Sequence, residues 1–397
     1  MPWHKTWAYK GSLNKRVCVA FSLLHTAVRP FMVVDTHTTP TLGFNRDGVV
    51  FFSGTYSGIM NTPYSKRYLP IEKQLTLLHS RGLAIQDFHN ASTVLKNVGY
   101  FKLSSYLYPF REIRPHKERI TPWNYRYNRF KQGFSLDDAI ALFDFDRRLS
   151  LLMFEALSII ETSFKALIAD AVGAMDPFLH LKPEALDRDQ CGRPARSGEG
   201  NAYSSWLDNY HRQRKRSKNE DYLRHHRMLH GDDVPIWMAV EFLDFGSTSY
   251  LFRLLPKDLK NAIARSWDVK QGSVVDSWVR NFNYTRNLVA HHSRLWNRHI
   301  VTRVQPPNPA VVDPSIHHLA KDRGSESSAN FNKIYPTLAL SAYVLSSIGE
   351  GDNWRSKLRL LMAEFPIIED ISPEKDMGFP AEWAELDIWN VNKTQQQ

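Results

Sequence analysis

The chain has 397 residues, of which 43% are hydrophobic and 23% are charged, so it can form a folded core and is not a wholly disordered protein. Its two cysteines, Cys18 and Cys191, lie far apart. They exclude a disulfide framework, a CxxC redox pair and a thiolate zinc site, and they suit a reducing cytosol. The net charge of +10 is compatible with a polyanionic partner.

The positive charge is concentrated in the middle of the chain. Residues 1–64 carry a net charge of +4 and residues 361–397 carry −6, so residues 65–360 carry +12. The acidic C-terminal stretch therefore masks part of a strongly basic central region.

The first 59 residues lack the hydrophobic pattern of the rest. The apolar run at 17–28 contains a serine and a histidine and is far shorter than a membrane span, so no membrane association is predicted. From Asp35 to Tyr64, Thr, Gly, Pro and Asn follow one another without periodicity. We expect residues 1–59 to be an unfolded or non-native extension, with Met60 as the natural start.

From Pro70 onward the pattern is helical. Gly82 is expected to end a first helix, and Asp87 to cap a second. Ser135 and Asp138 form a capping box that opens a helix or helix pair over 136–172. Further helices are predicted over 235–243, 251–255, 259–267 and 274–296, and a last pair over 333–364. Few segments alternate as strands do, so the predicted fold class is all-α.

Composition divides the chain into four segments. Residues 303–332 hold four prolines and the run Gly324-Ser-Glu-Ser-Ser, which is typical of a linker or excursion. We predict the irregular extension over 1–59, one helical domain over 60–302, the linker over 303–332, and C-terminal helices over 333–390 that complete the same domain.

The pattern Arg-Asn-x₃-His, formed by Arg286, Asn287 and His291, lies inside a predicted helix. Asn287 and His291 are four residues apart, so they would share a face and could hydrogen-bond. Arg286 lies about 140° around the helix from His291, so its side chain must curl back or meet an imidazole of another subunit. The chain has five Arg/His pairs at comparable spacing, about as many as chance produces, so the spacing alone identifies no site.

Longer motifs give this pattern its context. In chain order they are Leu69-Pro-Ile-Glu-Lys-Gln-Leu75, Arg81-Gly-Leu, Gly99-Tyr-Phe-Lys-Leu-Ser-Ser-Tyr106, Tyr108-Pro-Phe-Arg111, Phe143-Asp-Phe-Asp-Arg-Arg-Leu149, Ile160-Glu161, Pro235-Ile-Trp-Met-Ala-Val-Glu241, Phe245-Gly-Ser, Arg286-Asn-Leu-Val-Ala-His-His-Ser-Arg-Leu-Trp-Asn297 and Met377-Gly-Phe-Pro-Ala-Glu-Trp383. Through these motifs the stretch from about 68 to 389 resembles the Abi-like proteins, the AbiD/AbiF type of phage abortive-infection proteins.

The resemblance implies a HEPN-type helical bundle with additional helices, a class in which an R-x₄₋₆-H motif forms a metal-independent ribonuclease site. That site would consist of Arg286, Asn287 and His291, with no metal and no other cofactor. The imidazole can accept the 2′-OH proton, the arginine can hold phosphate oxygens, and Asn287 would orient the imidazole. Such sites are typically composite, which implies a homodimer or a second, degenerate motif in the chain.

Four further residues are candidate supports of the site: His292, Arg294, Arg147 and Glu161. Each also has a plainer structural interpretation. His292 can be a packed helix-face histidine, and Arg294 a solvated arginine at a helix end. Arg147 and Arg148 would form a charged network with Asp144 and Asp146. Glu161, among apolar neighbours, would be the buried partner of an arginine.

RNA contacts are predicted for five basic residues: Arg212, Arg214, Lys215, Arg216 and Arg298. The first four belong to the run 211–218, which could equally be a solvated loop. The histidine pairs at 225/226 and 317/318 lack further ligands at metal spacing, so no metal site is predicted.

These features predict a cytoplasmic endoribonuclease toxin of phage defence that acts as a homodimer and is silenced by an RNA or protein antitoxin. The alternative is a non-catalytic RNA-binding module of the same fold that holds a structured or guide RNA. A helical scaffold that neither binds nor cuts RNA is a third possibility. Cleavage of labelled RNA in EDTA separates the enzyme from the other two.

Overall fold

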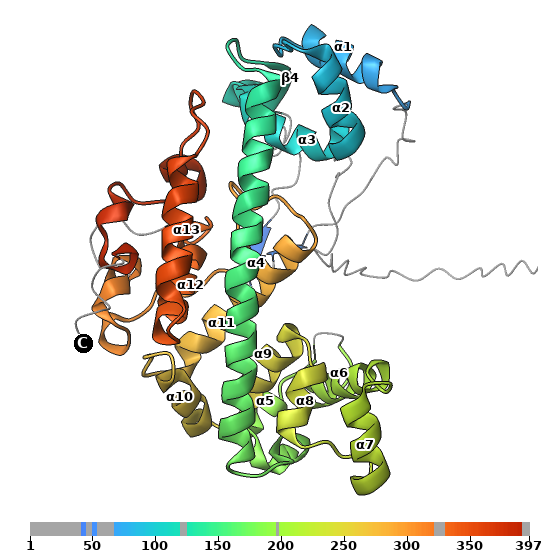
Figure 1. Cartoon of the computed structure of the whole chain (residues 1–397), viewed down its shortest axis with the longest axis vertical. Helices are drawn as coiled ribbons and strands as arrows, with labels where there is room; N and C mark the ends of the chain where they lie inside the picture. The colour runs from blue at the N-terminus through green and yellow to red at the C-terminus, as the bar shows by residue number, and fades with distance from the viewer. Residues whose placement is uncertain are drawn as a thin grey trace, which may run out of the picture. The chain divides into compact units, whose positions relative to one another are not determined.

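The computed structural model describes residues 41–44, 50–53, 67–119, 125–195, 198–320 and 330–390. The chain forms two compact units, Met1–Tyr68 with Ile113–Tyr127, and Leu69–Glu112 with Asn128–Gln397. All the α-helices of the described residues belong to the second unit (Figure 1). They make the described fold mostly helical, as predicted.

A strand pair lies in the extension that we expected to have no fold. Thr41–Phe44 (β1) and Val50–Ser53 (β2) pair antiparallel, with Thr41 opposite Ser53 and Phe44 opposite Val50. Val and Phe favour strands, but strands of four residues are too short to show a clear alternating pattern in the sequence. The other residues among the first 66 lie outside the described part, so the unfolded or non-native character of 1–59 stays a prediction.

The second unit begins with three short helices, α1 (Ile71–Ser80), α2 (Phe88–Val98) and α3 (Tyr100–Leu107). Gly82, with φ of +92°, follows the end of α1 in a conformation that glycine adopts without strain. The Asp87 side chain accepts hydrogen bonds from the backbone N–H groups of His89 and Asn90 and so caps α2. Both predicted helix ends are confirmed. Arg111–Ile113 (β3) and Arg126–Phe130 (β4) then form a two-stranded sheet.

A single helix of 38 residues, α4 (Leu136–Gly173), is the structural axis of the second unit (Figure 1). The predicted capping box is present: the Ser135 side chain accepts from the Asp138 N–H, and the Asp138 carboxylate accepts from the Ser135 N–H. At 1.5 Å per residue α4 is about 57 Å long. Along this length it packs against α3 and against α8 to α13.

After α4 the chain continues through α5 (Arg188–Cys191), α6 (Ala202–Arg216), α7 (Asp221–His230), α8 (Ile236–Phe242), α9 (Phe245–Leu254) and α10 (Lys257–Arg265). The basic run 211–218 is therefore not a loop, because most of it forms the last turns of α6. Asn201 caps α6, and the buried Trp206 and Tyr210 anchor it despite its polar composition.

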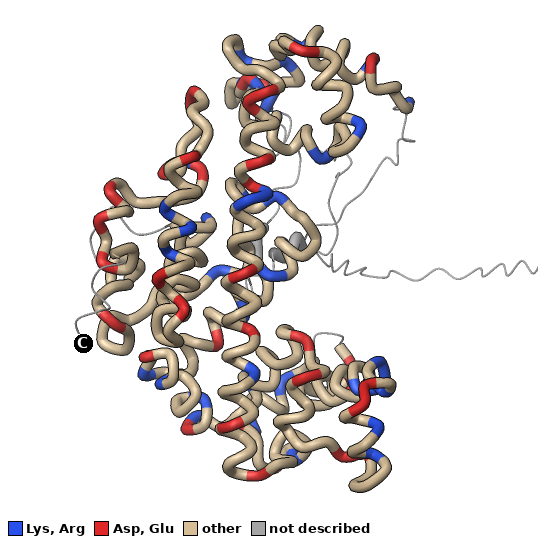
Figure 2. Tube along the Cα trace, viewed as in Figure 1, with Lys and Arg blue, Asp and Glu red and all other residues tan. Residues whose placement is uncertain are grey.

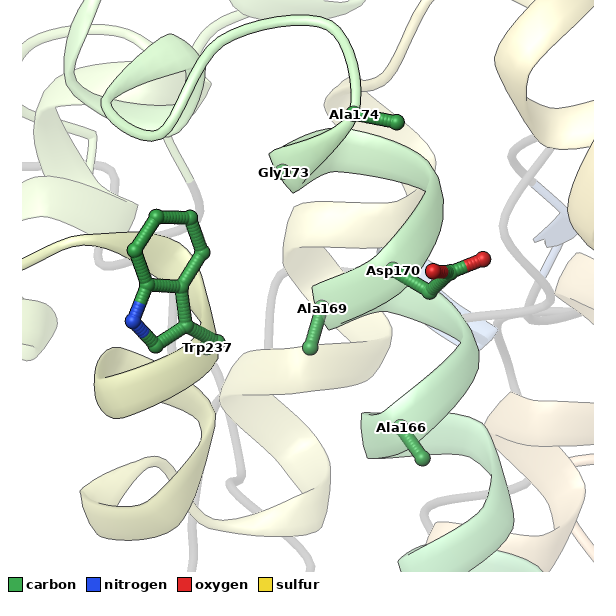
Figure 3. Close-up of a pocket in the computed structure, with 6 residues that line it drawn as sticks. All are labelled: Ala166, Ala169, Asp170, Gly173, Ala174 and Trp237. Atoms are coloured by element: carbon green, nitrogen blue, oxygen red, sulfur yellow. The ribbon is translucent and has the colours of Figure 1, made fainter.

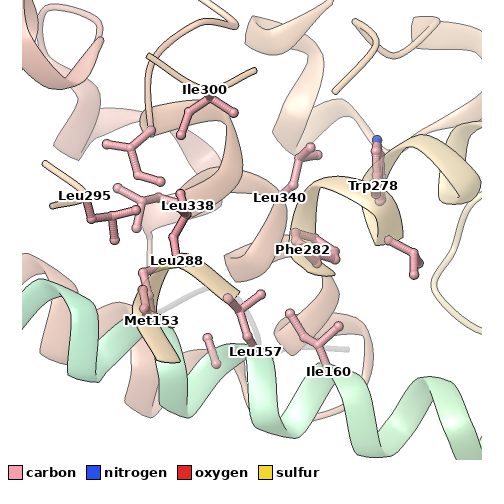
Figure 4. Packing of buried hydrophobic residues seen from close by; sticks show 14 of the residues in the cluster. Met153, Leu157, Ile160, Trp278, Phe282, Leu288, Leu295, Ile300, Leu338 and Leu340 are labelled. Atoms are coloured by element: carbon pink, nitrogen blue, oxygen red, sulfur yellow. The ribbon is translucent and has the colours of Figure 1, made fainter. Parts of the chain in front are cut away.

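The core lies between α4, α11 (Gly272–Ala290) and α12 (Tyr335–Ser347), which is followed by α13 (Gly351–Ala363). Figure 4 shows Met153 and Leu157 of α4 close to Leu288 of α11 and Leu338 of α12. α11 ends at Ala290, before the predicted end at 296. The reason is local: His292 adopts a φ of +52°, and the Ser293 N–H turns back to the Leu288 carbonyl oxygen at 2.8 Å.

The predicted linker is described over 303–320 and 330–332, and the stretch 303–320 packs against this core. Its short helical turns are Pro309–Val311 and Pro314–Leu319, and Ile316 and Leu319 have no exposed surface. The division of the chain into four segments stays a prediction. No helix among the described residues combines the length and the apolar composition that crossing a bilayer requires.

Candidate functional site

Arg286, in the last turns of α11, is held by both carboxylate oxygens of Glu161 on α4. Its Nε lies 3.2 Å from Oε2, and its Nη2 lies 3.1 Å from Oε2 and 3.3 Å from Oε1. The two side chains are 25% and 16% exposed, respectively. Lys165, one turn further along α4, pairs with Glu161 Oε1 at 3.2 Å. Glu161 is thus the arginine partner that its apolar surroundings indicated, and it fixes the plane of the guanidinium.

Asn287 is turned toward Arg286. Its Oδ1 accepts a hydrogen bond from Arg286 Nη1 at 3.1 Å. Among the described residues, no hydrogen bond joins the Asn287 side chain or the Arg286 guanidinium to the His291 ring. His291 is the C-cap of α11, where its backbone N–H bonds to the Asn287 carbonyl oxygen at 3.1 Å and its side chain is exposed. Asn287 and His291 are thus joined by a backbone hydrogen bond and not by one between their side chains.

The loop that follows His291 is tied to α3 and α4. Lys102 of α3 donates to the carbonyl oxygen of His292, and Arg294 Nη1 donates to the carbonyl oxygen of Ser105 at 2.5 Å. The backbone N–H of Trp296 donates to Asp146 Oδ1 at 2.7 Å. His292 and Arg294 therefore belong to the loop beside the motif, and Arg294 holds the backbone of α3.

Asp146 does not belong to the predicted charged network. It is 2% exposed, and besides the loop N–H groups it accepts a hydrogen bond from the Tyr106 hydroxyl at 2.7 Å. Burial raises the pKa of Asp146, and the hydrogen bonds from Tyr106 and the loop, together with the charge of Arg294, oppose that rise. The buried face of α4 also contains Leu142, Leu149 and Met153. A carboxylate at such a position is the sequence signal that could have indicated a buried, hydrogen-bonded group.

The rest of the predicted network is present and lies away from the motif. Arg147 pairs with Asp144 at 2.7 Å, and Arg148 pairs with Asp144 at 3.4 Å and also with Glu364. Arg147 is 58% exposed. It stands about 21 Å before Glu161 along the axis of α4, so the fold does not bring it to Arg286.

The five residues predicted to contact RNA fall in two places. Arg212, Arg214, Lys215 and Arg216 lie at the end of α6, and Figure 2 shows basic residues gathered there and along α7. Arg212 donates to Asn209, and Arg214 donates to the carbonyl oxygen of Asp232. Lys215 and Arg216 are exposed. Arg298 lies just beyond the motif loop, where its Nε donates to the Tyr284 hydroxyl at 3.3 Å.

Three residues that the sequence did not single out for this site belong to it: Lys165, Lys102 and Tyr106. The spacing of four between Glu161 and Lys165 could have indicated the first. Burial and the neighbouring Arg294 lower the pKa of Lys102, and the nearby Asp146 charge opposes this effect. Nothing in the spacing of Lys102 or Tyr106 indicates a contact with a loop almost 200 residues later.

Two further features of the described residues bear on chemistry. No group of three or more His, Cys, Asp or Glu side chains there is placed to hold a metal ion. A hollow at the C-terminal end of α4 is lined mainly by small side chains, Ala166, Ala169, Gly173 and Ala174, together with Asp170 and Trp237 (Figure 3). It contains none of the residues predicted to catalyse.

A family model described as "Abi-like protein" matches residues 93–297. The match includes Lys102, Asp146, Glu161 and Arg286, and it ends just after the motif loop. Comparison with curated proteins and with solved structures returns no match.

Proposed function

The chain belongs to the Abi-like family, whose name refers to abortive infection in phage defence, and we propose that it acts there as a metal-independent endoribonuclease toxin. The observation that carries the proposal is the placement of two groups at the end of α11. Arg286 is held in a fixed orientation by Glu161, and an exposed His291 follows in the next turn. A HEPN-type site, as the motifs imply, needs an oriented cation and an accessible imidazole of this kind.

In the proposed reaction, the His291 imidazole takes the proton of a ribose 2′-OH, and O2′ attacks the adjacent phosphorus. The O2′–P bond forms, the P–O5′ bond breaks, and O5′ takes up a proton. The products are a 2′,3′-cyclic phosphate and a 5′-OH end. Arg286 holds the non-bridging oxygens, whose negative charge grows in the transition state.

The guanidinium of Arg286 keeps hydrogen-bonding capacity for this role. Glu161 accepts hydrogen bonds from Nε and Nη2, and Asn287 accepts one from Nη1. Each terminal nitrogen of an arginine carries two N–H groups, so a second N–H on Nη1 remains for a phosphate. In this arrangement Asn287 orients the arginine, and the loop and helix end orient His291.

A homodimer would bring two copies of the motif together. The outer face of α4 carries exposed apolar side chains, with Leu151 at 61% and Phe154 at 46% exposure. Phe154 precedes Glu161 by seven residues, so the two lie on the same side of the helix. A second copy packed on this face would lie on the side of α4 that carries Glu161, and we propose that the active form is this dimer.

Cleavage of labelled RNA by purified protein in EDTA tests the proposal. We expect cyclic-phosphate ends from the wild type, and loss of cleavage in Arg286→Ala and His291→Ala. Arg265→Ala on α10 and His89→Ala on α2 are matched controls, because both side chains are exposed and neither belongs to the motif. Binding of RNA without cleavage by the wild type would favour a non-catalytic RNA-binding module that holds a structured or guide RNA.

A toxin that cleaves cytoplasmic RNA needs a partner that keeps it silent, and we propose an RNA or protein antitoxin. The His291→Ala protein can be expressed without killing its host, so its bound partners can be recovered. Sequencing the co-purified RNA and identifying co-purified protein by mass spectrometry should reveal the antitoxin. Recovery of neither, together with full toxicity of His291→Ala, would contradict this assignment.

A further inference from the structure

A buried carboxylate holds the loop that follows His291. The Leu295 N–H lies 3.1 Å from both Asp146 oxygens, and the Trp296 N–H lies 2.7 Å from Oδ1. The Tyr106 hydroxyl donates to Oδ2 at 2.7 Å. Burying a carboxylate costs free energy unless hydrogen bonds satisfy it, and three donors satisfy this one. A hydrophobic side chain at this position would leave the same three donors without an acceptor, so the carboxylate fixes the position of the loop.

The loop needs such contacts. His292 has a φ of +52°, a left-handed conformation that costs a non-glycine residue about 1 kcal/mol. Lys102 holds the His292 carbonyl oxygen, and Arg294 reaches back to the backbone of α3. Contacts from α3 and from Asp146 therefore restrain residues 292–296 from outside α11.

Asp146 and Glu161 lie on one rigid helix. They are 15 residues apart, about 22 Å along the axis of α4. Glu161 positions Arg286 through an ion pair, and Asp146 positions the loop next to His291 through backbone hydrogen bonds. Through these two carboxylates a single helix defines where both groups of the motif stand.

We infer that Asp146 is a positioning residue for the site, and that Tyr106 and Lys102 complete the anchor. This inference rests on the proposed function of Arg286 and His291. Asp146 touches no substrate; it acts by holding the loop so that the His291 ring stays in place relative to the Arg286 guanidinium.

Asp146→Asn tests this inference, with Asp144→Asn as the matched control. The asparagine places an NH₂ group against N–H and O–H donors. Asp144 lies two residues earlier with a side chain that is 47% exposed, and it forms ion pairs with Arg147 and Arg148. We expect Asp146→Asn to lower kcat for RNA cleavage at least tenfold with KM changed less than twofold. Hydrogen exchange of the Leu295 and Trp296 amides should accelerate, and Asp144→Asn should match the wild type in both measurements.

Tyr106→Phe is the second variant in case Asp146→Asn does not fold. It removes one oxygen that donates to Asp146 and keeps the ring, so we expect a several-fold loss of kcat and faster amide exchange in the same loop. Faster exchange with unchanged kcat in either variant would overturn the inference while leaving the proposed function intact. A wild type that fails to cleave RNA would overturn both.

Discussion

Glu161 on α4 and Arg286 on α11 lie 125 residues apart in the chain and form an ion pair. Three N–H···O hydrogen bonds join the guanidinium to the carboxylate. Both side chains are largely withdrawn from solvent, at 16% and 25% exposure, so water and salt screen this pair less than a surface pair. The contact joins the structural axis of the second unit to the helix that carries the motif.

Glu161→Gln should lower both stability and activity. The amide cannot pair with the two cations Arg286 and Lys165, so we expect the free energy of unfolding to fall by about 1–3 kcal/mol, as measured by urea denaturation. Glu155→Gln on the same helix is the control. Its ion pair with Lys357 is 41% and 43% exposed, and its loss should cost less than about 1 kcal/mol. Equal losses of unfolding free energy in the two variants would contradict a larger contribution of the Glu161–Arg286 pair.

The free energy of unfolding should fall in mild acid because two histidines are buried in the neutral form. Burial lowers the pKa of both His180 and His318 to about 4. In the unfolded chain a histidine has a pKa of about 6.5, so the unfolded state binds protons first as the pH falls. Stability is therefore complete above about pH 6.5 and is lost progressively toward pH 4.

For each of these histidines, the free energy of unfolding should be lower at pH 5 than at pH 7.5 by on the order of 1–2 kcal/mol. Urea denaturation at both pH values measures the difference. His180→Phe should make the pH dependence shallower, because the ring then packs with Trp206 and Tyr210 without a group to protonate. His89→Gln, at an exposed position, is the control. An unchanged pH dependence in His180→Phe would show that His180 does not titrate as proposed.

Lys102→Met should slow RNA cleavage several-fold because the methionine cannot donate to the His292 carbonyl oxygen. Lys102→Arg keeps a donor and should restore most of the activity. The measurement is kcat with RNA under saturating conditions, and Lys96→Met, at an exposed position of α2, is the control. Full activity of Lys102→Met would mean that the loop holds its conformation without this contact.

Lys215 and Arg216 should contribute to RNA affinity through phosphate contacts. Each contact with a single-stranded phosphate contributes about 0.7 to the slope of log K against log salt. The double substitution of both residues to alanine should therefore lower that slope by about 1.4 in a titration between low and high salt. Lys257→Ala with Arg265→Ala on α10 is the matched control, and an equal change there would indicate non-specific attraction.

Lysine substitutions at Leu151 and Phe154 should convert the proposed dimer to a monomer. A charged side chain within an apolar interface would be desolvated without a partner, which is costly. Light scattering coupled to size exclusion measures the mass, and RNA cleavage should disappear with the dimer. Leu360→Lys on α13, a residue that is 68% exposed, is the control. Retained cleavage by a monomeric variant would show that one copy of the motif suffices.

Local signals in the sequence predicted most of the helical architecture. Asp87, the Ser135–Asp138 capping box and Gly82 set helix ends through contacts within a few residues, and each is found where it was expected. The end of α11 was missed, because the residue in its left-handed turn is His292 and not a glycine, so the residue type gives no signal there. The basic helix α6 was missed because the buried Trp206 and Tyr210 outweigh its polar pattern.

The sequence by itself determined the family of this protein, its helical character and the motif of Arg286, Asn287 and His291. These features reside in residue order and in neighbours within one or two helical turns. Only the tertiary structure decided which groups contact that motif. Glu161 pairs with Arg286, and the Asn287 side chain also bonds to Arg286. Asp146, which was predicted in a charged network, is buried and holds the loop after His291. The physical reason is that the contacts of Glu161 and Asp146 join segments far apart in the chain, and the turn of Asn287 toward its neighbour Arg286 is a choice of side-chain orientation. Local residue patterns encode neither.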